Sequence, residues 1–188
     1  PAFGVVTGGL ILTGGHQTLS GINTYLGATT VNAGTLSVNG STATSSLTTV
    51  NAGGTLGGNG TVGNTAISGG ALAPGNSIGV LTVNGNLSFT AASSYMIEVS
   101  PSNADRVNVT GTATLGGATV NASFAPGSYV SRQYTILNAA GGLGGSTFGA
   151  IVNNNLPSSV TSSLSYDANN VYLNLALNFA VPGGLGGN

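Results

Sequence analysis

The chain has 188 residues, the length of one ordinary domain, yet it carries only 2 basic and 3 acidic residues. Charged residues make up 3% of the chain, whereas soluble domains usually contain about 25%. Two arginines cannot neutralise many phosphates, which argues against nucleic acid and anionic membrane surfaces as partners. The absence of cysteine excludes disulfides and thiolate metal sites, and a hydrophobic content of 40% favours an ordered chain over a disordered one.

The N-terminal stretch contains a strand-forming run, "GVVTGGLILTG" at 4–14. No basic segment followed by an apolar run stands at Pro1, and no run of about 18 apolar residues follows that would cross a membrane as a helix. We therefore expect an interior fragment or a mature piece of a protein that does not insert into a membrane directly.

The next part of the chain repeats a phrase, first as "TTVNAGTLSVNG" at 29–40 and then as "TTVNAGGTLGGNG" at 48–60. The copies are offset by 19 positions, from Val31 to Val50. Val, Leu and Thr alternate with period two and Gly or Asn ends each run, which favours short strands over helices. A period near twenty is typical of one coil of a parallel β-helix, in which each strand pairs with its equivalent in the next coil.

The alternation also predicts which side chains fill the thin core of such a coil. The expected core residues are Val31, Leu36, Val38, Leu47, Val50 and Leu56. Asparagine tolerates the left-handed conformation at a corner, and it can stack on its counterpart in the next coil.

From Tyr95 onward the glycine corners become irregular, and all charged residues lie in this part. The runs "QYTILNA" at 133–139 and "SSLSYDANNVYLNLAL" at 162–177 predict longer antiparallel strands, the second with a turn at 167–170. Because the open end of a coil stack exposes unpaired backbone, we expect a separate β-hairpin capping module there. The expected organisation is parallel β-helix coils over 1–94, a C-terminal cap over 95–177 and a linker over 178–188.

The stretch "TLSGINTYLGATTVNAGTLSVNG" at 18–40 resembles the autotransporter-associated β-strand repeat, whose members look like L-x-L-x-G-x-N-T-Y-x-G-x-T-T-V-N-A-G-T-L. Residue 26 is Leu where the family usually has Thr. The positions that match are Leu19, Gly21, Asn23, Thr24, Tyr25, Gly27, Thr29, Thr30, Val31, Asn32, Ala33, Gly34, Thr35 and Leu36.

The C-terminal part contains "DRVNVTGTATLGGATVNASF", "QYTILNAAGGLGG" and "LSYDANNVYLNL" in this order, and it is similar to the autochaperone region that ends an autotransporter passenger domain. Together the two resemblances cover most of the chain, from about residue 18 to residue 177. They imply type V secretion by a Gram-negative bacterium and an all-β fold, a right-handed parallel β-helix held outside the outer membrane. The implied partner is the protein's own C-terminal β-barrel, outside this chain.

The sequence offers no set of residues suited to catalysis. The single histidine, His16, precedes Asp105 by 89 positions. That separation is roughly four to five coils, or about 20 Å, whereas a general base and its orienting carboxylate must lie about 3 Å apart. A glycosidase needs a pair of carboxylates, and Glu98 with Asp105 is the only plausible pair, so the sequence supplies too few suitable residues for glycoside hydrolysis. We therefore predict no enzyme activity and name no catalytic, cofactor-binding or metal-binding residue.

Two glycine-rich motifs are better explained as structural features. "GNGTVG" at 58–63 matches G-x-G-x-x-G but is not followed by a helix pattern or an acidic residue, so we expect a β-corner. "GGLGG" at 141–145 is not followed by an aspartate until Asp167, which argues against a calcium-binding repeat.

The remaining charged residues are interpreted as structural. Asp105 and Arg106 are neighbours on an expected strand and should point to opposite faces. Glu98 and Arg106 are a candidate surface pair, which would contribute less than about 1 kcal/mol. Five N-x-S/T triplets follow from a composition rich in Asn, Ser and Thr, and they begin at Asn39, Asn59, Asn86, Asn108 and Asn121.

Two functional hypotheses follow. The first is a non-enzymatic stem of an autotransporter passenger that supports display and adhesion at the bacterial cell surface or in the extracellular medium, with the C-terminal module aiding the folding of the coils. The second is a self-assembling subunit of an extracellular filament, in which β-helix ends stack through the run at 4–14.

Overall fold

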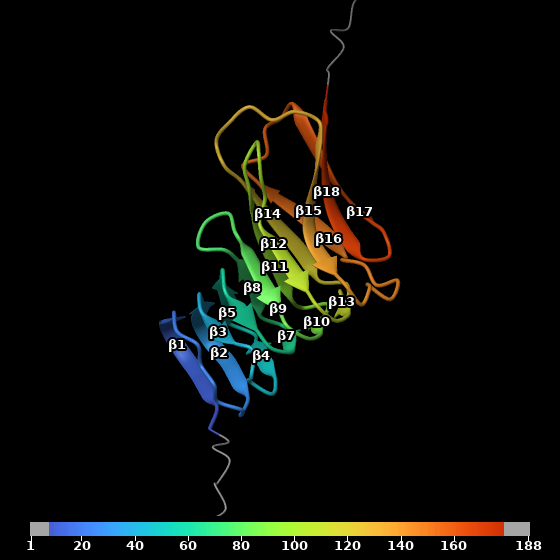
Figure 1. Ribbon diagram of the computed structural model, residues 1–188. Coiled ribbons are helices and arrows are strands. Elements are labelled where there is room, and N and C mark those ends of the chain that lie inside the picture. The colour runs from blue at the N-terminus through green and yellow to red at the C-terminus, as the bar shows by residue number, and fades with distance from the viewer. Residues whose placement is uncertain (1–7, 179–188) are drawn as a thin grey trace, which may run out of the picture.

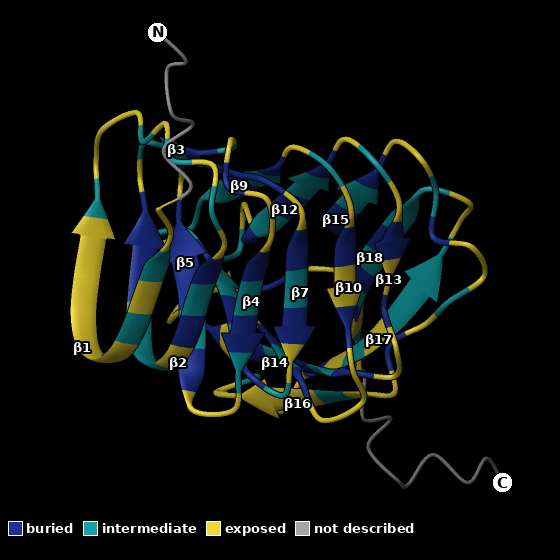
Figure 2. Ribbon diagram, turned by 90° about the horizontal axis from the view of Figure 1, so that it is seen from below, coloured by how far each residue is buried: buried dark blue, intermediate teal, exposed yellow. Residues whose placement is uncertain are grey.

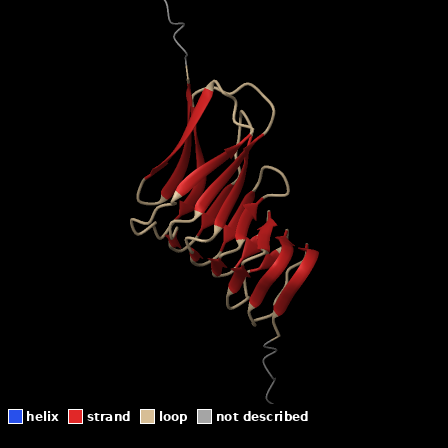
Figure 3. Ribbon diagram, turned by 180° about the vertical axis from the view of Figure 1, so that it is seen from behind, coloured by secondary structure: helices blue, strands red, loops and turns tan. Residues whose placement is uncertain are grey.

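The computed structural model describes residues 8–178, and the regular structure in this range is entirely β-strand (Figure 3). The prediction of an all-β chain is confirmed, and none of these residues forms a helix long and apolar enough to cross a membrane. The strands are β1 Leu10–Leu19, β2 Thr29–Val38, β3 Ser41–Thr42, β4 Thr48–Asn51, β5 Gly54–Gly58, β6 Thr61–Val62, β7 Thr65–Ser68, β8 Ala71–Pro74, β9 Val80–Val83, β10 Leu87–Phe89, β11 Ser94–Val99, β12 Arg106–Val109, β13 Ala113–Thr114, β14 Thr119–Phe124, β15 Arg132–Ala139, β16 Ala150–Asn154, β17 Val160–Tyr166 and β18 Asn170–Leu177.

The strands form two curled sheets in which most neighbours are parallel. The larger sheet has the order β13-β10-β7-β4-β2-β5-β8-β11-β14-β16 with β1 attached to β2, and the smaller sheet has the order β17-β18-β15-β12-β9-β6-β3. Strand β2 joins the halves of the larger sheet, because its first residues pair with β4 and its later residues pair with β5. Figure 1 shows the strands stacked from the blue N-terminal end to the red C-terminal end.

The parallel register places apolar residues of successive strands above one another. One column runs through Leu36, Leu56, Leu72, Tyr95 and Val120, each paired with the next. All five are fully buried. The steps along this column are 20, 16, 23 and 25 positions, so the period near twenty varies with the length of the turns between strands.

The core lies between the sheets, where buried residues face inward (Figure 2). Five of the six residues expected there are buried, which confirms most of the alternation. The prediction for Leu47 was wrong, because this side chain is 40% exposed. Leu47 immediately precedes the buried Thr48 that begins β4, so strand alternation turns Leu47 outward.

The corners combine asparagine and glycine. Asn51 Nδ2 donates to Asn32 Oδ1 at 2.8 Å, which confirms the expected stacking between successive copies of the repeat. The corner asparagines Asn32 and Asn51 do not use the left-handed conformation: within residues 8–178, Asn155 is the one non-glycine residue with positive φ. In both Asn-Ala-Gly copies the glycine adopts this conformation instead, at φ 77° for Gly34 and 89° for Gly53, because it has no Cβ to clash.

The predicted C-terminal antiparallel strands are confirmed. Strands β17 and β18 form a hairpin, and β15 pairs antiparallel with β18 while its other edge pairs parallel with β12. The parallel ladder continues past residue 94 through β11, β14 and β16, so coil-type pairing extends into the range assigned to the cap. Of the predicted linker at 178–188, all but residue 178 lies outside the described residues.

Candidate functional site

The most distinctive site is a groove of about 330 Å³ on the smaller sheet, which we call the arginine groove. It lies where β12 and β15 separate: their parallel pairing begins with Val107 opposite Leu137, whereas residues 132–135 pair with β18. Its polar lining consists of Ser102, Asn103, Arg106, Arg132, Gln133 and Thr135. Residues 132–135 of β15 therefore have β18 on one edge and no partner among the described strands on the other, which leaves room for the groove.

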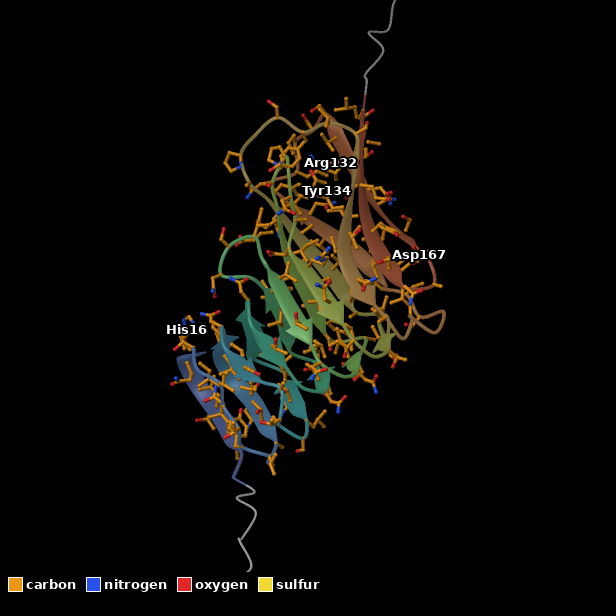
Figure 4. The ribbon with its side chains drawn as sticks, viewed as in Figure 1. His16, Arg132, Tyr134 and Asp167 are labelled. Atoms are coloured by element: carbon orange, nitrogen blue, oxygen red, sulfur yellow. The ribbon has the colours of Figure 1, made fainter. Side chains whose placement is uncertain are left out.

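Arg132 is held over an aromatic ring at this groove. Its guanidinium carbon lies 5.4 Å from the ring centroid of Tyr134, and Nη1 donates to the carbonyl of Pro101 at 3.1 Å. Tyr134 is buried and its hydroxyl donates to the carbonyl of Ser100 at 2.9 Å. Figure 4 shows the two side chains together near the C-terminal end of the stack. The side chain of Arg132 is therefore exposed to solvent, but these two contacts fix its orientation.

Arg106 enters the same groove from β12. The side chain is half-buried, and its Nε atom is buried without a hydrogen-bond partner. In the neighbouring strand β15, the pairing with β18 is irregular between Thr135 and Leu137. Both Ile136 and Leu137 are buried there. Buried nitrogen donors normally have partners, so the Nε atom of Arg106 is unusual.

Asp105 lies on the other side of the chain, in a second groove of about 300 Å³ that Glu98 also lines. The expected opposite orientation of Asp105 and Arg106 is thereby confirmed. Glu98 and Arg106, the candidate surface pair, line different grooves. They start from different sheets, β11 and β12, which separates them.

The carboxylate of Asp105 fastens two backbone segments. Oδ1 accepts the N–H of Gly79 and Oδ2 accepts the N–H of Glu98, each at 2.7 Å. Burial raises the pKa of Asp105 to about 6, while these two hydrogen bonds act to lower it and the Glu98 charge raises it further. Both carboxylate oxygens are occupied by backbone donors, which favours a structural role over acid–base chemistry with Glu98.

His16 lies on β1, exposed, with Nε2 at 2.9 Å from Ser37 Oγ. Figure 4 places it at the opposite end of the molecule from Arg132 and well away from Asp167. The structure therefore does not bring this histidine together with the labelled charged residues.

Asp167 organises the turn of the β17–β18 hairpin. Oδ1 accepts the N–H groups of Asn169 and Asn170 at 2.8 and 2.6 Å, and Oδ2 accepts the hydroxyl of Tyr172 at 2.7 Å. These bonds, with that of the Asn170 side chain first, lower the pKa of Asp167 to about 2. The predicted turn is confirmed, and the hydrogen bonds of Asp167 stabilise it.

The glycine-rich motifs and the sequons at Asn39, Asn59 and Asn86 lie at turns and corners, whereas Asn108 and Asn121 lie within β12 and β14. "GNGTVG" spans the end of β5 and the two residues of β6, as the β-corner interpretation predicts. Residues 141–145 form a turn, and no group of three or more potential metal ligands occurs in the part of the chain described. Asn39 Oδ1 accepts the N–H of Asn59 at 3.3 Å, and Asn86 Oδ1 accepts that of Thr112 at 2.9 Å.

The sequence interpretation missed the arginine groove because it treated two arginines only as too few for a basic patch. Their spacing of 26 positions gives only a coarse signal of neighbouring strands, because β12 and β15 are offset by 30 positions, with Val107 opposite Leu137.

Comparison with known proteins gives no match. No protein-family model matches the chain, and no curated protein is significantly similar to it. A function must therefore be sought in the residues and the fold.

Proposed function

We propose that the chain is a right-handed parallel β-helix that forms the non-enzymatic stem of a bacterial autotransporter passenger and supports display and adhesion outside the outer membrane. The observation that carries this proposal is the repeated parallel register. Strands β4, β7 and β10 pair in succession, as do β5, β8 and β11, and β6, β9 and β12. A chain that returns to the same three stacks in turn is what a coil predicts.

Close approach of the backbone at the corners supports this interpretation. A Cβ atom on Gly40 would overlap the carbonyl oxygen of Gly21, and one on Gly60 would overlap that of Gly40. The corner glycines thus allow adjacent turns to stack at β-sheet spacing, near 4.8 Å. This requirement explains why glycine recurs at these corners.

The C-terminal end is suited to start the folding of the stack. Strands β17 and β18 pair through a short turn, with Tyr166 opposite Val171, so little loop entropy is lost when they meet. Parallel strands of the stack require the closure of a whole coil before any ladder forms. A local hairpin joined to β12 through β15 would present a formed edge on which earlier coils assemble.

Aromatic side chains of the C-terminal module pack against those of the coils. The rings of Phe89, Tyr95 and Phe148 form a cluster with centroid distances of 5.6 to 5.9 Å. The hydroxyl of the fully buried Tyr95 donates to the carbonyl of Ile136 in β15. The C-terminal module and the coils therefore share one core, which a templating role requires.

The test has a genetic and a cellular part. We expect the coding frame beyond Asn188 to continue into alternating strands suited to an outer-membrane barrel. In that full protein, deletion of 95–177 should abolish protease-resistant display of an epitope placed ahead of the coils. The control deletes 29–60, which removes repeats but retains the C-terminal module and should leave display intact. Normal display after deletion of 95–177, or a frame that ends near Asn188, would contradict the proposal.

A second candidate function, assembly into an extracellular filament, is favoured by the open edge of β1. This strand pairs with β2, and no other described strand pairs with it. It carries no charge, and Ile11 is 67% exposed. Long uncharged edges invite pairing with another chain.

Lysines on this edge test the filament. The double substitution Ile11→Lys with Thr13→Lys should abolish concentration-dependent assembly in analytical ultracentrifugation. The matched control places lysines at the exposed Ser158 and Ser159, away from β1. Filaments that persist in the first variant would refute assembly through β1.

A further inference from the structure

The only two cationic side chains of the protein line the same groove. Arg106 and Arg132 are the whole basic complement of 188 residues, and both border the arginine groove. The three carboxylates lie elsewhere: Glu98 and Asp105 line the second groove, and Asp167 binds the hairpin turn. The arginine groove is therefore the most positive part of an almost uncharged molecule.

Neither guanidinium is neutralised by an acidic side chain in the part of the chain that the structure describes. Arg132 donates to a carbonyl and packs on the ring of Tyr134. Arg106 retains a buried Nε donor without a partner. Both arginines line the groove, so an oxyanion there would meet two cations that no described carboxylate neutralises.

We infer that the arginine groove binds the carboxylate of a small acidic sugar. A guanidinium presents N–H donors in a planar fork that matches the two oxygens of a carboxylate. A volume of about 330 Å³ falls at the lower end of ligand pockets, the size of a mono- or disaccharide. Two cations are too few for a nucleic acid.

The rest of the lining selects a hydroxylated ligand. Ser102, Asn103 and Thr135 contribute hydroxyl and amide groups that both donate and accept hydrogen bonds. Such groups complement sugar hydroxyls, whereas an apolar ligand would leave them unpaired. Gln133 is fixed beside them, because its Nε2 donates to Asn174 Oδ1 at 2.8 Å.

The experiment is a titration of the full chain, labelled with ¹⁵N, with glucuronate followed by NMR. We expect saturable shifts of the two arginine Nε signals and of the amides of 102–106 and 132–135, with a Kd of about 1 mM. Glucose tests the need for the carboxylate, while acetate and inorganic phosphate test the need for the sugar. Glucose, acetate and inorganic phosphate should each bind at least about tenfold more weakly.

Variants decide whether the groove is the site. Arg106→Gln and Arg132→Gln should each raise the Kd for glucuronate about tenfold or more. The control Glu98→Gln changes the net charge by one in the other groove and should leave the Kd unchanged. Arg132 is exposed, so its substitution tests the site even if Arg106→Gln does not fold.

Three results would overturn the inference. Absence of saturable shifts with glucuronate would remove the site. Equal binding of acetate or phosphate would refute an acidic sugar in favour of any small oxyanion. Unchanged affinity in Arg132→Gln would show that the sugar binds elsewhere.

Discussion

Replacement of Asp105 by asparagine should remove a pH dependence of stability that this carboxyl creates. Burial raises its pKa from 3.8 to about 6 in the folded chain. Between these values the native state binds more protons than the unfolded state, so the free energy of unfolding falls as pH rises. The raised pKa corresponds to a loss of up to about 3 kcal/mol between pH 3.8 and pH 7.

The assay is reversible urea unfolding followed by circular dichroism at intervals from pH 4 to pH 7. For the natural chain we expect the unfolding free energy attributable to Asp105 to be greatest near pH 4 and to decline through pH 6. Asp105→Asn should flatten the curve over this window. Glu98→Gln should reduce the decline only in part, because the charge of Glu98 is a minor cause of the raised pKa.

A curve for the natural chain that rises from pH 4 to pH 7, and loses that rise in Asp105→Asn, would refute the reasoning. Such a result would mean that the N–H groups of Gly79 and Glu98 stabilise the ionised carboxylate by more than burial destabilises it.

Three further predictions concern the core, the corners and the hairpin turn. Leu72→Ala should lower the unfolding free energy by about 2–5 kcal/mol in urea titrations, because the side chain is fully buried, whereas the exposed Leu47→Ala should cost less than about 1 kcal/mol. Gly60→Ala should lower the thermal midpoint because its Cβ would overlap a neighbouring carbonyl, while Gly14→Ala, with open space around it, should not; equal midpoints would contradict the stacked corner. The pKa of Asp167, lowered to about 2, predicts that its stabilisation persists above pH 4 and is lost as pH falls through 2, as NMR titration of the hairpin can verify.

Much of the fold was predictable because its determinants are local. The alternation around Val31 and Val50 placed both in the core, and the Asn-Ala-Gly phrase placed Asn32 and Asn51 at stacked corners. These features recur with the period of the sequence repeat, near twenty residues. Leu47 was misplaced because the side of the sheet depends on where β4 begins, and a shift of one residue reverses it.

The arginine groove depends on relations that no local pattern carries. β15 pairs with β18 from Arg132 to Asn138 but with β12 only over residues 137–139, and the irregularity next to Ile136 sets the side on which its residues emerge. Both features arise from pairing with a strand more than thirty positions away. The spacing of Arg106 and Arg132 does not indicate that β12 and β15 are offset by 30 positions, nor that residues 132–135 have no partner in β12.

The order in which the strands form during refolding tests the central claim most directly. In pulsed hydrogen exchange on the full chain, the account predicts that amides of β15, β17 and β18 become protected before those of β2, β4 and β5. Such an order is required if the C-terminal module templates a stem of stacked coils. Protection that appears first in β2, β4 and β5, or simultaneously in both regions, would contradict it.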